Sequence, residues 1–213
     1  MATNVTLEKE VMIEGIKKLS TKDIRLKKFL KKFRVSVLPI EKNYFWSLCR
    51  SVIYQQISGK AAKKISDRYL ALFDQSIKMT PLDVLEIDIE KIYKVGISRQ
   101  KSSYIKNIAD AFSKNIINEK NISELDDQEI IKQLTSIKGV GRWTAEMFLI
   151  FTLRRTDVFP VTDLGVQKGF QIFYSLDELP TIELMNEKSE SWRPYRTIMA
   201  LYLWFAVEGP FEW

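Results

Sequence analysis

The chain has 213 residues, 46% of them hydrophobic, which is enough for one sizeable domain or two smaller lobes with a buried core. Its 33 Lys and Arg residues outnumber 27 Asp and Glu residues, and the formal net charge of +6 favours a polyanionic partner over an acidic small molecule. The sequence contains no histidine, which excludes a Ser-His-Asp triad, a His-ligated catalytic zinc and a deaminase site of the His/Cys type. Any acid–base chemistry must therefore come from carboxylates, Lys, Tyr or the backbone.

The single cysteine, Cys49, cannot form an internal disulfide or ligate a four-cysteine iron–sulfur cluster alone. Its position on an apolar stripe of a predicted helix indicates a buried structural thiol. The chain has no run of about eighteen apolar residues, and the N-terminus MATNVTLEKEVMIEG has no uninterrupted signal-peptide core. We therefore expect a reduced, intracellular protein with no membrane association.

Apolar residues recur at helical spacing along almost the whole chain, and almost nothing alternates like a strand. The pattern of apolar residues, caps and prolines predicts helices over residues 6–19, 22–33, 41–56, 58–73, 81–94, 99–118, 126–136, 141–154, 163–174, 181–190 and 194–207. The stretch VSVLP at 35–39 is interpreted as a connector, and no Gly/Ser linker marks a domain boundary. The predicted fold class is all-α.

The segment from Leu134 to Phe170 is the most informative part of the sequence. One helix is expected to end near Ser136, a tight turn follows at Lys138-Gly139-Val140-Gly141, and a strongly apolar helix begins at Arg142 or Trp143. The two glycines let the backbone turn sharply and approach another surface closely, and the next helix offers unpaired N–H groups at its positive end. Such a turn suits a phosphate, and Lys138 and Arg142 add positive charge there. A plain helix-to-helix turn remains the alternative for a bare GVG.

Asp163 lies in VTDLGVQKGF, after Pro160 and before an amphipathic helix. Asp163 can be a simple N-cap, as can Thr162. An ionised carboxylate at a helix N-terminus can also stabilise positive charge that develops on a sugar, or orient and deprotonate a water molecule. The two interpretations are compatible.

Taken together, a helix, IKGVG, a second helix and an aspartate 22 residues beyond Gly141 resemble the helix-hairpin-helix base-excision DNA glycosylases. Within that superfamily, GVGRWTAEMF, DVFPVTDLGV and SWRPYRTIMALYLW are similar to segments of the 3-methyladenine DNA glycosylase II family. Weaker similarity runs through FWSLCRSVIYQQISGKAAKKI and VGISRQKSSYIKNIAD, so the resemblance covers about residues 14–207.

The resemblance implies two helical lobes, 42–154 with the helix-hairpin-helix, and 1–41 together with 155–213, with a cleft between them for one flipped nucleotide. It implies that Asp163 is the catalytic carboxylate and that the partner is double-stranded DNA with a damaged base. The DNA-binding residues would be Lys138, Gly139, Val140, Gly141, Arg142, Thr144 and Gln56. Of the basic residues Lys60, Lys63, Lys64, Arg99 and Lys101, only a minority is expected to touch phosphate.

In related bifunctional enzymes the position after GVGR holds a lysine that forms a Schiff base with the sugar. This sequence has Trp143 there, so we expect base removal without lyase activity. Trp143 is either a core residue of the hairpin or a contact of the base. Trp204 corresponds to a base-pocket aromatic of the family, whose face would attract a cationic methylated purine, although an aromatic stripe at helical spacing is also typical of a core. Met147 stands where a close relative has a tyrosine, which leaves one pocket wall and the damage spectrum open.

Gln56 aligns with the family's wedge residue, which fills the gap left by a flipped base; the alternative for Gln55 and Gln56 is a polar helix end. The resemblance also implies a monovalent cation, Na⁺ or K⁺, on the backbone carbonyls of Thr135, Ile137 and Val140, with no other cofactor required. A monomer is the simple expectation.

The sequence thus predicts a monofunctional glycosylase that excises alkylated purines such as 3-methyladenine and 7-methylguanine. A cationic base is already a good leaving group, so a site without histidine needs no strong general acid. Two alternatives stay open: a non-catalytic helix-hairpin-helix DNA-binding protein, and a bifunctional glycosylase/lyase acting on oxidised or mismatched bases.

Overall fold

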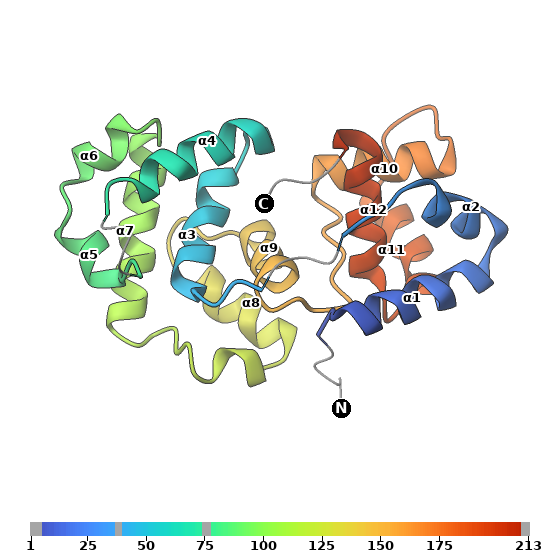
Figure 1. Ribbon diagram of the computed structural model, residues 1–213, viewed down its shortest axis with the longest axis horizontal. Coiled ribbons are helices and arrows are strands. Elements are labelled where there is room, and N and C mark those ends of the chain that lie inside the picture. Colours follow the sequence, from blue (N-terminus) through green and yellow to red (C-terminus); the bar gives the residue numbers. More distant parts are fainter. Residues whose placement is uncertain (1–5, 37–39, 74–77, 210–213) are drawn as a thin grey trace. The chain divides into compact units, whose positions relative to one another are not determined.

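The computed structural model describes residues 6–36, 40–73 and 78–209, and in these residues the secondary structure is helical (Figure 1). The described residues contain no strand; one isolated antiparallel bridge joins Thr6 to Arg155. The predicted all-α class is confirmed. Of the connector predicted at 35–39, residues 37–39 lie outside the described residues, and 35 and 36 have no regular secondary structure.

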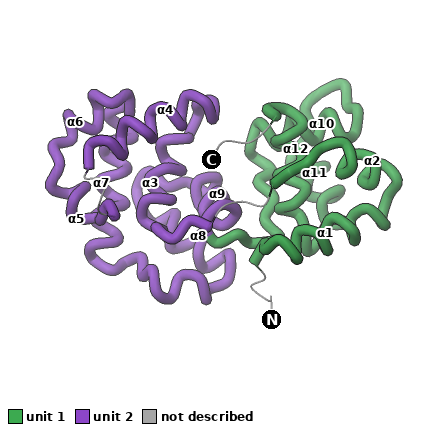
Figure 2. The backbone as a smooth tube through the Cα atoms, in the orientation of Figure 1, with its two compact units in different colours: residues 1, 3–39, 153–211 green, residues 2, 40–152, 212–213 purple. Residues whose placement is uncertain are grey.

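The chain divides into two compact units, which Figure 2 shows in different colours. The first unit comprises the described residues 6–36 and 153–209, and the second comprises 40–73 and 78–152. Within the described residues the units change between 36 and 40 and between 152 and 153, whereas the sequence places the lobe boundaries at 41/42 and 154/155. The lobe ends at 1–5 and 210–213 lie outside the described residues.

The first unit is built from five α-helices and a short 3₁₀ turn within its described residues: α1 (Lys9–Lys22), α2 (Ile24–Lys32), α10 (Leu164–Tyr174), α11 (Ile182–Ser189), the turn Glu190–Trp192 and α12 (Arg196–Glu208). Helices α10 and α12 pack against each other, and α1 packs against α2 and α12. Trp192 is buried among the rings of Phe159, Phe170 and Tyr174. This core holds the start of α10, where Asp163 lies, against α12.

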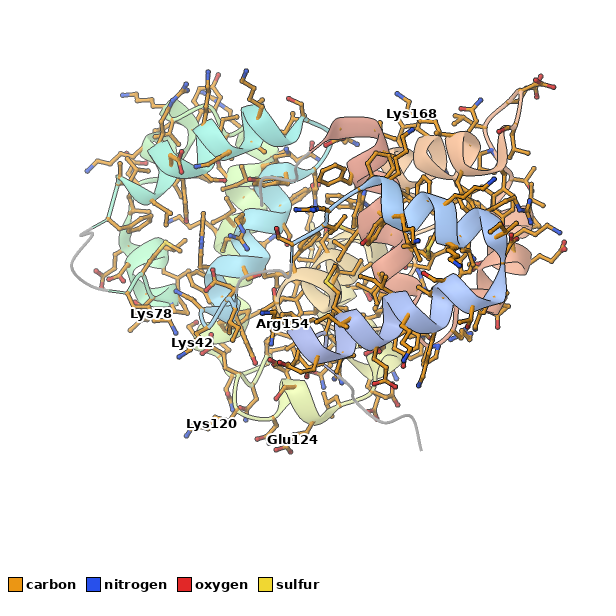
Figure 3. All side chains as sticks on the ribbon, turned by 45° about the vertical axis from the view of Figure 1, so that its right-hand side comes forward. Lys42, Lys78, Lys120, Glu124, Arg154 and Lys168 are labelled. Carbon is orange, nitrogen blue, oxygen red and sulfur yellow. The ribbon has the colours of Figure 1, made fainter. Side chains whose placement is uncertain are left out.

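The start of the chain is tied to the segment that follows α9. Leu7 donates its backbone N–H to the carbonyl of Arg154 at 2.6 Å. The guanidinium of Arg154, labelled in Figure 3, pairs with Glu8. The two sequence-distant parts of the first unit are therefore joined by backbone and side-chain contacts.

The second unit has α3 (Tyr44–Tyr54) and α9 (Arg142–Phe151) as its most buried helices. The unit also contains α4 (Gly59–Leu70), α5 (Pro81–Glu86), α6 (Ile89–Lys94), α7 (Arg99–Ser113), the 3₁₀ turn Ile122–Glu124 and α8 (Asp127–Thr135). Helix α3 packs against α4, α7 and α9, and α8 packs against α9. An apolar surface on nearly every side of α3 and α9 is the pattern of a helix enclosed by others.

Two predicted helices differ from the structure by more than about two to four residues at an end. The predicted helix 81–94 is two helices, because Ile87 is extended and the carboxylate of Asp88 caps a new helix by accepting from the N–H of Glu90 at 3.0 Å. The predicted helix 99–118 ends at Ser113, and Asn115 turns the chain with a φ of 55°. Asp and Asn satisfy the backbone of caps and turns better than that of helix interiors, which the apolar periodicity alone does not reveal.

Candidate functional site

Helices α8 and α9 are joined by residues 136–141, called here the hairpin. Ser136 ends α8, Gly139 has a φ of 102°, and the N–H of Val140 donates to the carbonyl of Ile137 at 3.0 Å. Gly141 is the N-cap of α9 and no side chain caps this N-terminus. Because Gly141 has no side chain, it cannot occupy the N–H groups at the positive end of α9.

The two glycines of the hairpin do different things. A Cβ atom at Gly139 would overlap Cγ and Cδ1 of Tyr104, a residue of α7, so the ring packs directly on the Gly139 backbone. A Cβ atom at Gly141 would meet no protein atom within 4 Å. Gly139 is thus required by the turn itself, and Gly141 leaves open space beside the N-terminus of α9.

Polar side chains from neighbouring helices form hydrogen bonds with the backbone of the hairpin. Asn107 of α7 donates from Nδ2 to the carbonyl of Lys138 at 3.0 Å. The side chain of Gln55, at the end of α3, donates from Nε2 to the carbonyl of Gly139 at 3.1 Å and to Oγ1 of Thr144 at 2.9 Å. The hairpin conformation is therefore held from α3 and α7 as well as by its own backbone.

The side chains predicted to bind DNA at the hairpin differ in exposure. Lys138 and Arg142 are exposed, and Nε of Arg142 lies 3.0 Å from Oε1 of Glu146, one turn along α9. Val140 and Thr144 are buried. Charged side chains and the backbone thus form the accessible part of the hairpin, and the Thr144 hydroxyl is bonded within the protein.

The chain reverses direction after α3 at Gln56 and Ile57, called here the tip. Gln56 has a φ of 57° and is exposed, and the apolar side chain of Ile57 is 39% exposed. Ser58 then caps α4. A left-handed residue followed by an exposed isoleucine therefore forms the turn at the place where the sequence predicts a wedge.

Asp163 is the N-cap of α10. Its Oδ1 accepts a hydrogen bond from the N–H of Val166 at 2.8 Å and another from Nε1 of Trp204 at 2.7 Å. The residue is partly exposed. Asp163 therefore caps α10 while the residue stays partly exposed, and the indole of Trp204 on α12 orients its carboxylate.

The indole reaches Asp163 because residue 165 is a glycine. A Cβ atom at Gly165 would lie 2.7 Å from Cδ1 and 3.0 Å from Nε1 of Trp204, and 3.1 Å from Oδ1 of Asp163. Trp204 itself is only 3% exposed. The structure thus brings together Asp163 and Trp204, and Gly165 provides the space for their contact.

A second carboxylate interacts with Asp163 from the last turn of α12. Burial raises the pKa of Glu208 above its usual value, the negative charge of Asp163 raises it further, and the positive charge of Lys168 lowers it. Glu208 is one turn beyond Trp204 on the same helix. The electrostatic environment of Asp163 therefore includes a neighbouring acid on α12.

The other predicted pocket residues lie on α9. Trp143 is partly exposed and Met147 is 1% exposed. Both belong to the second unit, whereas Asp163 and Trp204 belong to the first. Met147 is a core residue of the second unit in this structure, and Trp143 at the start of α9 keeps an exposed side.

The residues predicted to hold a cation lie at the end of α8 and in the hairpin. Within the described residues no cluster of three or more His, Cys, Asp or Glu side chains could hold a metal ion. The carbonyl of Ile137 accepts one bond, from Val140, and a carbonyl oxygen has two lone pairs. Thr135 is the last residue of α8, so its carbonyl lies at the negative end of that helix, which favours a cation.

Sequence reasoning missed Gln55, Tyr104, Asn107 and Gly165 as determinants of the site. The glycine that follows Asp163 by two positions was a usable signal, because glycine near the start of a helix often permits close packing. The contacts of Gln55, Tyr104 and Asn107 had no such signal, since they depend on how α3 and α7 pack on the hairpin.

Comparison with known proteins places these features in a family. Residues 49–194 match the model of the HhH-GPD superfamily of base excision DNA repair proteins, and the chain belongs to this family. It is 36% identical over 181 residues to DNA-3-methyladenine glycosylase 1 of Schizosaccharomyces pombe, covering 84% of this chain and 79% of the relative. It is 31% identical over 200 residues to DNA-3-methyladenine glycosylase of Saccharomyces cerevisiae, covering 76% and 66%.

Solved structures give the same relationship. The 3-methyladenine DNA glycosylase of Schizosaccharomyces pombe in complex with abasic DNA matches with a TM-score of 0.84 and 34% identity, over 90% of this chain and 95% of that one. The DNA-3-methyladenine glycosidase of Bacillus halodurans matches with a TM-score of 0.77 and 33% identity, over 91% and 89%. The predicted resemblance to the 3-methyladenine glycosylase II family is confirmed.

Within the described part of the chain, none of the helices combines the length and the apolar character that crossing a bilayer requires.

Proposed function

We propose that this protein is a monofunctional DNA glycosylase that flips an alkylated purine out of duplex DNA and hydrolyses its N-glycosidic bond. The family, the names of the relatives and the abasic-DNA complex of one structural neighbour support this proposal. The single observation that carries it is the partly exposed residue Asp163, whose carboxylate is oriented by the indole N–H of Trp204. We further propose that the protein acts as a monomer on genomic DNA inside the cell.

The reaction breaks the bond between the sugar C1′ and the purine nitrogen. The bonding electron pair leaves with the base, and a methylated purine that carries a positive charge departs as a neutral molecule. Positive charge then develops on the deoxyribose, which a nearby carboxylate stabilises. Water adds to C1′ and loses a proton, and Asp163 is the group that would orient this water and accept the proton.

The hairpin is proposed to hold a DNA phosphate. The N-terminus of α9 has no side-chain cap, and the space beside Gly141 lets a phosphate oxygen approach its N–H groups. Lys138 and Arg142, both exposed, add positive charge at this place. Contacts of this kind fix the register of a protein on DNA without reading the sequence, as a repair enzyme that scans DNA requires.

A monovalent cation on the carbonyls of Thr135, Ile137 and Val140 is proposed to accompany this phosphate. The cation would supply positive charge beside the phosphate and neutralise the carbonyl dipoles that end α8. No other cofactor is proposed, because hydrolysis of the glycosidic bond to a cationic base needs only a carboxylate and water.

The prediction that the enzyme lacks lyase activity depends on Trp143. Because no lysine follows Gly141-Arg142, no Schiff base can form at that position, and base removal should leave an intact abasic strand. We expect free methylated bases from DNA treated with dimethyl sulfate, measured by chromatography, without strand cleavage and without a protein–DNA adduct after borohydride. A trapped adduct would favour the bifunctional alternative, and binding without base release would favour the non-catalytic one.

Trp204 offers a sharper test of the site. Trp204→Phe keeps an aromatic ring and removes the N–H that bonds Asp163. A hydrogen bond to a charged group contributes about 1.5–3 kcal/mol, so single-turnover release of 7-methylguanine should slow roughly 10- to 100-fold.

Gly165→Ala is the companion variant, because its methyl group would press on the indole while Trp204 keeps its N–H donor. Alanine near the start of a helix is otherwise favourable. We therefore expect slower release of 7-methylguanine from Gly165→Ala, caused by displacement of the contact between Trp204 and Asp163. If Trp204→Phe reacts as fast as wild type, the indole N–H plays no part and Trp204 acts through its ring alone.

A further inference from the structure

The corner that follows α3 is anchored from two sides. The ammonium group of Lys101 on α7 donates to the carbonyls of Ile53 and Gln55, at 2.9 and 2.5 Å, and thus satisfies carbonyls at the end of α3. The side-chain amide of Gln55 donates to the carbonyl of Gly139 and to the hydroxyl of Thr144. The backbone that enters the tip is therefore fixed by one residue of α7, and the tip is joined to the hairpin by one side chain.

The amide of Gln55 bonds a peptide group that is already held at its other end. The peptide between Gly139 and Val140 accepts from Gln55 through its carbonyl and donates to Ile137 through its N–H. Gly139 has no Cβ and a φ of 102°, so no side chain of Gly139 itself limits the freedom of this peptide to rotate. Gln55 removes that freedom at the N-terminus of α9.

The second acceptor of Gln55 lies in the first turn of α9. Thr144 is the third residue of the helix, and its buried hydroxyl accepts from the same amide nitrogen that bonds Gly139. One side chain therefore spans the junction between the hairpin and α9, where the phosphate is proposed to bind. The next residue along the chain, Gln56, begins the tip.

We propose that Gln55 is a positioning residue that couples the tip to the hairpin, so that a phosphate bound at α9 determines where Gln56 and Ile57 enter the base stack. The proposal rests on the proposed function, since it assumes that the hairpin and the tip both contact damaged DNA. A methionine at position 55 has similar length and no donor, so it would leave the tip in place but free the hairpin peptide to rotate.

The experiment uses a duplex that carries a tetrahydrofuran abasic analogue opposite 2-aminopurine, whose fluorescence reports the stacking of the orphaned base. Saturating wild-type protein should change this fluorescence, and Gln56→Ala should reduce the change because the tip produces it. Gln55→Met should retain less than half of the wild-type change at saturation. Gln128→Met, the same substitution at an exposed position on α8, should retain all of it.

A loss of folding is separated from a loss of coupling by a second variant. Thr144→Val removes one acceptor and leaves Gln55 in place, and it should give an intermediate fluorescence change with a normal thermal unfolding curve. The coupling would be overturned if the single variants Gln55→Met and Thr144→Val both gave the wild-type fluorescence change, or if Gln56→Ala gave it. The readout needs no base release, so a protein that gives the expected fluorescence but releases no methylated base would refute the proposed function alone.

Discussion

Asp163→Asn is expected to slow the release of methylated purine by about 10²- to 10⁴-fold while the protein stays folded. Asparagine keeps an oxygen at the position of Oδ1, which can still accept from the N–H of Val166 and from the indole of Trp204. Asn and Asp are equally good N-caps, so the free energy of unfolding should change by less than about 1 kcal/mol. The substitution therefore removes the negative charge and turns Oδ2 into an amide donor, while the two bonds to Oδ1 are kept.

Three measurements together test this expectation: single-turnover base release, thermal unfolding, and affinity for a duplex with an abasic analogue. The affinity should stay close to that of wild type, because the hairpin is unchanged. Asp163→Ala is the control that loses the cap as well, and it should unfold at a lower temperature. Wild-type base release by Asp163→Asn would leave Asp163 with a structural role only.

Gly139→Ala is expected to have the largest effect on stability. Its Cβ atom would overlap the ring of Tyr104, and its φ of 102° disfavours any side chain. Positive φ costs about 1–2 kcal/mol and overpacking about 1–3 kcal/mol, so the free energy of unfolding should fall by roughly 2–5 kcal/mol. For a chain of this size the melting temperature should drop by roughly 4–20 °C.

Gly141→Ala is the matched control on the same turn. Gly141 has a φ of −88° and open space around its Cβ position, so the melting temperature should change little. The added methyl group would stand where a phosphate approaches, and DNA affinity should fall about tenfold, which is 1.4 kcal/mol. If Gly141→Ala binds DNA like wild type, the phosphate does not approach at this glycine.

Much of the fold could be predicted from the sequence because helix signals here are local. Apolar periodicity and caps such as Ser58, Asp126 and Asp163 mark where helices begin. The break at Asp88 was missed because an aspartate inside an apolar pattern is equally compatible with a solvated helix face. The choice of cap over helix interior depends on a hydrogen bond that periodicity does not encode.

The candidate site was predictable only in part. Motifs marked Asp163 and the hairpin, since glycine and aspartate are required there by backbone geometry and charge. The hydrogen bond from Trp204 to Asp163 joins residues 41 positions apart, and that from Gln55 to Gly139 joins residues 84 apart. Such contacts arise from the packing of α12 on α10 and of α3 on α9, which no local pattern specifies.

The most direct test of the account is single-turnover release of free base from duplexes that each carry one lesion: 7-methylguanine, hypoxanthine, 8-oxoguanine, or none. A site with a carboxylate and no histidine should release the cationic purine first, at least about tenfold faster than hypoxanthine, because the charged base is the better leaving group. The strand should stay intact until alkali is added. Preferential release of 8-oxoguanine, or strand cleavage that accompanies base loss, would contradict the account.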